Sequence, residues 1–265
     1  YVGEVVCSKR APLNAPYFDA VLERLQKAGK TVVRASLAQV ALERDRQQVA
    51  ADTQETRVPV EINDVSAFWH LAGKPCRVGP FLNVYSEDAL AFVARKGATH
   101  VTLSPELPES ALSVLGDAAR KLGVTLEMQV FGRLPLALSA RCYHARAHGR
   151  IKDPCRYACG EDTDGMALET LDGQEFLSIN GIQTLSHTCL NLLPELSALQ
   201  KIGFSAFRLS PHSGDMVAVS KLFRDVLDGQ RDPASASAAL REILPENMPF
   251  SNGFFHRVEG WRWVA

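Results

Sequence analysis

The chain has 265 residues, with 29 Lys and Arg against 30 Asp and Glu, so its formal net charge is -1. This near neutrality excludes a broad nucleic-acid footprint and an electrostatic membrane anchor. Hydrophobic residues make up 46% of the chain and charged residues 22%, which is the composition of a globular protein with a sizeable core. No apolar run approaches the ~18–20 residues of a membrane span, and the first residues lack a signal-peptide pattern, so we expect a cytoplasmic protein.

Apolar runs of strand length alternate with segments of helical period along most of the chain. Strands are predicted at residues 1–6, 31–37, 58–62, 81–85, 100–103, 125–130, 175–179 and 206–209. Helices are predicted at residues 15–28, 64–72, 86–96, 109–121, 190–202 and 216–227. Short links between alternating strands and helices imply parallel strands with right-handed crossovers. We therefore expect an α/β fold of the TIM-type (β/α) barrel class, as a single domain over residues 1–265.

Three features depart from a regular barrel. The chain opens directly on the first predicted strand and without an initiator Met, so we expect the natural chain to begin earlier and the barrel to lack its first βα unit. Residues 139–171 hold Arg, His, Gly, Pro and three cysteines with little periodicity, which indicates an irregular, metal-binding insertion. Residues 232–265 begin with a short helix and end in an aromatic tail, which we expect to pack on the barrel.

Cysteine usage is the most specific signal. The six cysteines are Cys7, Cys76, Cys142, Cys155, Cys159 and Cys189. A chain with a large core and no export signal favours thiols or metal ligands over disulfides. Cys142, Cys155 and Cys159 form Cys-x12-Cys-x3-Cys inside the irregular insertion, which predicts a local cage for zinc or an iron–sulfur cluster.

Such a cage needs a fourth ligand from elsewhere in the chain. Cys7 is the best candidate, because it directly follows the first predicted strand. Cys76 and Cys189 fit less well and are expected to be packing thiols. His144 and His148 could instead complete a zinc site.

Cationic residues surround the candidate ligands, which supports metal binding more strongly than it identifies the metal. They are Lys9, Arg10, Arg141, Arg146, Lys152 and Arg156. Cations beside a thiol favour the thiolate and offset the negative charge of a thiolate-bound centre. The irregular spacing favours a 4Fe–4S cluster over zinc, whose structural sites use tight Cys-x2-Cys pairs.

Polar residues at predicted strand ends are candidate substrate contacts, because these ends face the mouth of a barrel. They are Glu61, Asn83, Glu106, Asn180 and Arg208. The planar guanidinium of Arg208 suits a carboxylate ligand. A serine-hydrolase motif, Gly-x-Ser-x-Gly, is absent from the sequence. The basic insertion leaves open a local contact with RNA phosphates, although nucleic acid is not the expected partner of a neutral chain.

Five segments in order resemble a known family. They are Tyr1-Val-Gly-Glu-Val-Val-Cys7-Ser-Lys-Arg10, Gly132-Arg-Leu-Pro-Leu-Ala-Leu-Ser-Ala-Arg-Cys142, Lys152-Asp-Pro-Cys155-Arg-Tyr-Ala-Cys159, Asn180-Gly-Ile-Gln-Thr184 and Arg208-Leu-Ser-Pro211. Together they are similar to the UbiV family of ubiquinone-biosynthesis proteins, a branch of the collagenase-like peptidase family.

The resemblance implies a 4Fe–4S cluster held by Cys7, Cys142, Cys155 and Cys159. It also implies an iron–sulfur subunit of an oxygen-independent ring hydroxylase rather than a peptidase. A UbiU-like subunit would be its heterodimer partner, a lipid-binding protein would present the prenylated aromatic ring, and prephenate would donate the hydroxyl group. An RNA base hydroxylase of the same family and a non-catalytic zinc-binding scaffold stay open as alternatives.

Overall fold

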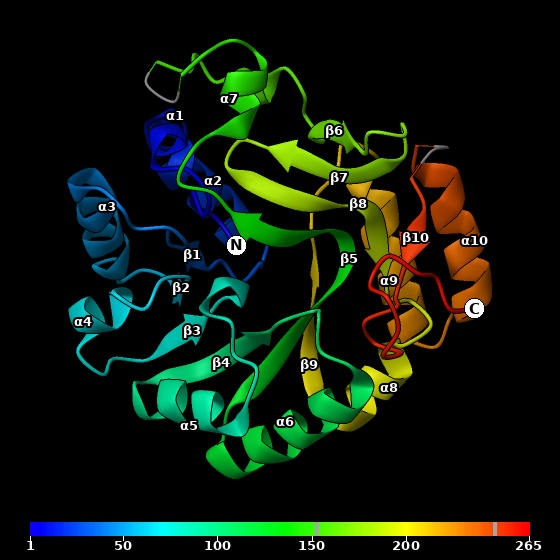
Figure 1. The fold of residues 1–265 in the computed structure, drawn as a ribbon. Coiled ribbons are helices and arrows are strands. Elements are labelled where there is room, and N and C mark those ends of the chain that lie inside the picture. The colour runs from blue at the N-terminus through cyan, green and yellow to red at the C-terminus, as the bar shows by residue number, and fades with distance from the viewer. Residues whose placement is uncertain (152–153, 246–247) are drawn as a thin grey trace. The chain divides into compact units, whose positions relative to one another are not determined.

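A computed structural model of the chain describes residues 1–151, 154–245 and 248–265 (Figure 1). Lys152, one of the cations near the cysteines, lies outside the described residues. The chain divides into two compact units. Unit 1 comprises Tyr1–Ser104 and Ala118–Thr125, and unit 2 comprises Pro105–Asp117 and Leu126–Ala265. None of the described helices has the length and apolar composition that crossing a membrane requires.

Unit 1 is built on four parallel strands that are neighbours in sequence order. They are β1 (Arg34–Ala35), β2 (Val60–Ile62), β3 (Cys76–Val78) and β4 (Ala98–Leu103). Its helical elements are η1 (Ser8–Arg10), α1 (Ala11–Asn14), η2 (Ala15–Tyr17), α2 (Phe18–Lys27), α3 (Glu43–Thr53), α4 (Ala67–Leu71), η3 (Pro80–Leu82) and α5 (Glu87–Arg95). Parallel neighbours with helical connections confirm the α/β class and have the sequential order found in a TIM-type barrel.

The predicted strand at residues 1–6 is wrong. Only Val2 makes a bridge, to Arg34. The Glu4 carboxylate accepts hydrogen bonds from the backbone amides of Val6, at 2.8 Å, and Cys7, at 3.0 Å. A side chain that captures nearby backbone amides competes with the strand ladder. No further bridge therefore follows Val2, although the Val5 carbonyl accepts a hydrogen bond of 2.7 Å from the Ala38 amide.

The predicted strand at residues 81–85 is also wrong. The strand is β3, a few residues earlier, and the apolar run forms η3 instead. Pro80 has no amide to donate to a ladder, and Asn83 ends η3 with a left-handed φ of 54°.

Helix α3 was not predicted from the sequence. It has no apolar period, because its buried residues include Asp45 and Asp52.

Unit 2 is organised around the long strand β5 (Thr125–Leu138), of which all but the first residue belongs to this unit. Strand β5 is parallel to β9 (Phe204–Leu209) and antiparallel to β8 (Gln183–Asn191). Beyond β8 follow β7 (Glu175–Asn180) and β6 (Met166–Glu169), both antiparallel to their neighbours, and β10 (Phe250–Ser251) is parallel to β8. The other elements of this half are α6 (Glu109–Leu122), whose last turns belong to unit 1, α7 (Tyr143–Ala147), η4 (Ala158–Gly160), α8 (Leu196–Ile202), α9 (Met216–Leu227) and α10 (Pro233–Ile243).

The helix predicted at residues 190–202 is wrong in its first half. Strand β8 continues to Asn191, which pairs with Phe131 of β5, and α8 begins only at Leu196. Leu190, near the end of β8, pairs with Gly132 of β5 on one side and with Ser251 of β10 on the other. A short apolar run has no period that separates these two outcomes, so tertiary pairing decides.

Both the insertion and the C-terminal tail belong to unit 2. The insertion at residues 139–171 contains α7, η4 and β6, and α7 lies beside β7 (Figure 1). In the tail, the Asn252 side chain holds the last residues by two hydrogen bonds with the backbone of Val264, at 2.7 and 2.9 Å. Trp263 contacts Phe250 of β10, with ring centroids 5.7 Å apart. The expected single domain over residues 1–265 stays a prediction.

We predict that Gly132→Ala lowers the free energy of unfolding by about 3 kcal/mol. Gly132 has a φ of 101°, and an added Cβ would lie 2.6 Å from the Cβ of Ser210. The control is Gly229→Ala, where φ is 69° and nothing lies within 4 Å, so only the conformational cost of about 1 kcal/mol applies. Urea denaturation of both variants measures the difference, and equal losses would contradict the close approach of β5 and the segment after β9.

Candidate functional site

Burial separates the six cysteines into two groups. Cys76 and Cys189 are 2% and 1% exposed. Burial raises the pKa of the Cys76 thiol to about 11 and that of the Cys189 thiol to about 12. Metals bind the thiolate, so these two residues are packing thiols in their present surroundings.

The other four cysteines are Cys7, Cys142, Cys155 and Cys159, and all are partly exposed. None of the six, which all fall within the described ranges, forms a disulfide. Cys7 belongs to unit 1, and the other three belong to unit 2. The four partly exposed thiols are the same four residues that the resemblance assigns as cluster ligands.

In unit 2, the turn between β7 and β8 brings two of the thiols to one place. Gly181 begins this two-residue turn with a φ of 64°, which favours glycine. The Cys142 thiol donates a hydrogen bond of 3.3 Å to the Gly181 carbonyl. A Cβ placed on Gly181 would lie 3.9 Å from the Cβ of Cys159. Cys142 and Cys159 therefore flank one residue of the hairpin.

The segment between Cys155 and Cys159 is conformationally strained. Arg156 and Tyr157 have φ values of 50° and 54°, both in the left-handed region that residues with a Cβ rarely adopt. Two such residues in succession cost about 1–2 kcal/mol each. Strain of this kind is typical of functional segments that the surrounding structure holds in place.

The segment that carries Cys7 is held by one carboxylate. Oε1 of Glu4 accepts hydrogen bonds from the Val6 and Cys7 amides, and it also lies 2.9 Å from Nη2 of Arg10. Arg10, one of the cations predicted to offset cluster charge, is thus paired with an acid.

The insertion also contains a histidine and carboxylate cluster. His144 and His148 stack in parallel, with ring centroids 5.2 Å apart. Their Nε2 atoms lie 2.8 and 2.9 Å from the same oxygen, Oδ2 of Asp162. Hydrogen bonding from His148, and to a smaller extent from His144, lowers the pKa of the Asp162 carboxyl.

A second carboxylate of the insertion holds the loop that follows β9. Asp164 accepts a hydrogen bond from the Ser213 amide at 2.9 Å and lies 3.5 Å from Nε2 of His212. Burial lowers the pKa of His212. The insertion is therefore attached both to the β7–β8 turn and to the segment after β9.

Two of the five predicted substrate residues lie in unit 1. Glu61 on β2 is buried and accepts a hydrogen bond of 3.1 Å from the Asn63 amide group. Asn83 is exposed at the end of η3 and not at a strand end.

The other three lie in unit 2. Glu106 is half-buried in a turn, and Asn180 at the end of β7 donates a hydrogen bond of 3.3 Å to the Thr163 carbonyl. Nε of Arg208 on β9 donates to Oε1 of Glu127 on β5, at 2.5 Å. Of these three, Asn180 adjoins the turn that flanks the cysteines, and a role of Arg208 in carboxylate binding stays a prediction.

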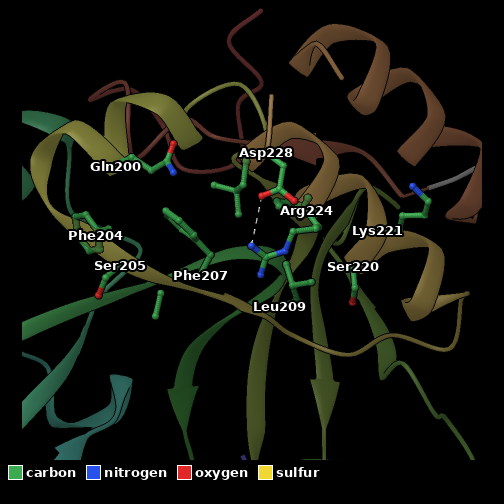
Figure 2. A pocket seen from close by; sticks show the side chains of 12 residues that line it. Gln200, Phe204, Ser205, Phe207, Leu209, Ser220, Lys221, Arg224 and Asp228 are labelled. Carbon is green, nitrogen blue, oxygen red and sulfur yellow. Dashed lines mark ion pairs between the residues drawn. The ribbon is translucent and has the colours of Figure 1, made fainter. Parts of the chain in front are cut away.

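Figure 2 shows a pocket of about 570 Å³ lined by residues of α8, β9 and α9. Phe204, Phe207 and Leu209 form its apolar part. Arg224 and Asp228, 3.7 Å apart, form an ion pair at its side. No described residue of the insertion lines this pocket, so we treat it separately from the cysteine site.

A larger pocket of unit 2, the aromatic pocket, has several aromatic residues among its mainly apolar walls. Its volume is about 1110 Å³, and residues of β7, β8, β10 and the C-terminal tail contribute to its walls. The aromatic lining residues are Phe176, Phe250, Phe254, Trp261 and Trp263. Phe176 and Trp261 are 60% and 67% exposed. A pocket of this size and lining is suited to a largely apolar small molecule.

Sequence reasoning missed Asp162 and Asp164. The spacing of His144 and His148 is that of one helix face and could have indicated a paired site. Asp162 and Asp164 lie in a non-periodic stretch, and no local pattern connects them with their partners.

The comparison with known families covers nearly the whole chain. A sequence model of peptidase family U32 matches residues 1–264. No solved structure matches the chain significantly.

We predict that a thiol reagent at pH 8 modifies Cys7, Cys142, Cys155 and Cys159 in the native, metal-free protein and leaves Cys76 and Cys189 unmodified. The raised pKa values of the two buried thiols keep them protonated at this pH, and burial also denies access. Mass spectrometry of tryptic peptides identifies the modified residues. Denaturation in urea should expose all six thiols. Modification of Cys76 or Cys189 in the native protein would contradict the division of the cysteines into buried and accessible groups.

Proposed function

Because the chain belongs to peptidase family U32, we propose that it is an iron–sulfur subunit of an oxygen-independent ring hydroxylase that acts in ubiquinone biosynthesis. The observation that carries the proposal is the division of the cysteines. Burial removes Cys76 and Cys189 from consideration and leaves the four ligands that the resemblance to UbiV proteins implies.

The donor set fits a 4Fe–4S cluster. Cys142, Cys155 and Cys159 would supply three thiolates from unit 2, and Cys7 would supply the fourth. When bound, such a cluster supplies single-electron chemistry.

The chain's own residues prepare the ligand segments. The Gly181 carbonyl orients the Cys142 thiol, and Glu4 orders the backbone at Cys7. The strained backbone at Arg156 and Tyr157 sets the direction of the chain between Cys155 and Cys159. Ligand segments held in this way lose less conformational entropy when a metal centre binds.

The aromatic pocket supports a prenylated aromatic ring as the substrate class. Its apolar walls and exposed Trp261 would favour such a ring and its chain over a peptide or a nucleic acid. In this proposal a UbiU-like subunit completes a heterodimer, a lipid-binding protein presents the substrate, prephenate donates the hydroxyl group, and the reaction takes place in the cytoplasm. Glu61, Asn83, Glu106, Asn180 and Arg208 remain proposed substrate contacts.

We predict a brown protein on anaerobic purification, with roughly four iron and four sulfide per chain. Cys155→Ala should lose the cluster, because one of the four thiolates is removed. Cys76→Ala is the matched control and should retain it, since its thiol is buried and protonated. Iron and sulfide analysis with visible absorption measures both. Stoichiometric zinc in place of iron would overturn the proposal in favour of a zinc-binding scaffold.

For the function, we predict that deletion of the gene abolishes ubiquinone synthesis without oxygen and leaves synthesis in air intact. Quinone extraction and liquid chromatography measure this, with complementation by the wild type and by Cys155→Ala. The wild type should restore synthesis, and Cys155→Ala should not. Unchanged anaerobic quinone together with altered RNA hydroxylation would contradict the proposal and favour an RNA base hydroxylase.

A further inference from the structure

A second cluster of metal-binding side chains lies in the insertion, separate in its donor atoms from the cysteines. It consists of His144, His148 and Asp162. One ligand atom from each residue lies within 4.8 Å of the others. His144 is fully buried, whereas the side chains of His148 and Asp162 are 26% and 33% exposed. One histidine of the cluster is therefore buried, and the other two side chains are accessible to solvent.

The two histidines are spaced to bind one ion. They lie four residues apart at the start and end of one helical segment, with α7 spanning Tyr143–Ala147 and His148 directly following it. This spacing places two imidazoles on one helix face, as in helical two-histidine metal sites. Both Nε2 atoms point to the same Asp162 oxygen.

The other ring nitrogen of each histidine, Nδ1, also has polar partners. Nδ1 of His144 lies 3.0 Å from the Ile179 carbonyl, which can only accept a hydrogen bond. The Gly181 amide donates a hydrogen bond of 3.4 Å to the same nitrogen, so two backbone groups hold the His144 ring in place. Nδ1 of His148 lies 3.3 Å from the Glu161 carboxylate. A carbonyl or carboxylate on the other ring nitrogen is the usual support of a metal-ligating histidine.

This arrangement brings three donor atoms together around one point. Both Nε2 atoms converge on one anionic oxygen, to which they donate hydrogen bonds at 2.8 and 2.9 Å. A shift of each proton to Nδ1 would leave both Nε2 lone pairs available to a metal ion. One divalent ion between the three atoms would satisfy both lone pairs and the carboxylate together.

We propose that His144, His148 and Asp162 bind one divalent first-row transition metal ion, of which Zn²⁺ is the probe, at a site separate from the four cysteines. Imidazole and carboxylate donors suit such ions. Metal bonds of about 2.0–2.2 Å in a tetrahedral site place ligand atoms roughly 3.3 Å apart, so the two contacts need to open by about 0.5 Å. Three protein ligands leave a coordination position for water or a small ligand. The proposal does not depend on the proposed ring hydroxylation.

The test is a Zn²⁺ titration of the anaerobically purified, cluster-containing full chain against a chromophoric chelator. We expect one zinc ion bound per chain and an increase in melting temperature on its addition. His148→Ala and Asp162→Asn should each weaken zinc binding at least about 100-fold, because loss of even an outer partner costs about 10–100-fold. These two residues are chosen because they are partly exposed, and circular dichroism checks that both variants fold.

Two controls locate the ion. His187→Ala removes another histidine of unit 2 that pairs with a carboxylate, at 3.2 Å from Glu175, and should leave zinc affinity unchanged. Cys155→Ala should also retain zinc binding. Unchanged zinc affinity in folded His148→Ala and Asp162→Asn would overturn the proposal. Loss of zinc binding in Cys155→Ala would overturn it too, because the ion would then depend on the cysteines.

Discussion

A hydrogen bond from the Cys142 thiol to the Gly181 carbonyl joins the cysteine-bearing insertion to the hairpin of β7 and β8. The turn can make this contact because Gly181 adopts a left-handed φ, which directs its carbonyl to Cys142 while Cys159 packs nearby. The same turn places its amide beside His144. Much of the geometry of the insertion therefore depends on one glycine and its neighbours.

Burial then determines which thiols are available for chemistry. Cys76 and Cys189 lie in strands whose neighbours exclude water, so their thiols stay protonated. The remaining cysteines lie outside the regular strands and retain access to solvent. Six thiols of identical intrinsic chemistry can thus differ in whether their thiolate is available to a metal ion.

Several carboxylates stabilise the fold through contacts that a sequence pattern does not predict. Glu127 engages Arg208, Glu4 orders the segment at Cys7, and Asp164 holds the loop after β9. Each carboxylate connects segments or backbone groups whose contact cannot be predicted from the local sequence pattern. Arg208, which is one of the proposed substrate contacts, is thus also a structural partner of Glu127.

The sequence by itself determined the α/β class, the parallel order of the early strands and the cysteine spacing, because these depend on local period and on residue identity. It misplaced β3 and the start of α8, because short apolar runs have no period of their own and are assigned by the strands that pair with them. The tertiary structure bore out the expectation that Cys76 and Cys189 are the buried thiols. It alone also brought Asp162 to His144 and His148 across a stretch without periodicity, since such contacts depend on chain segments that no local pattern relates.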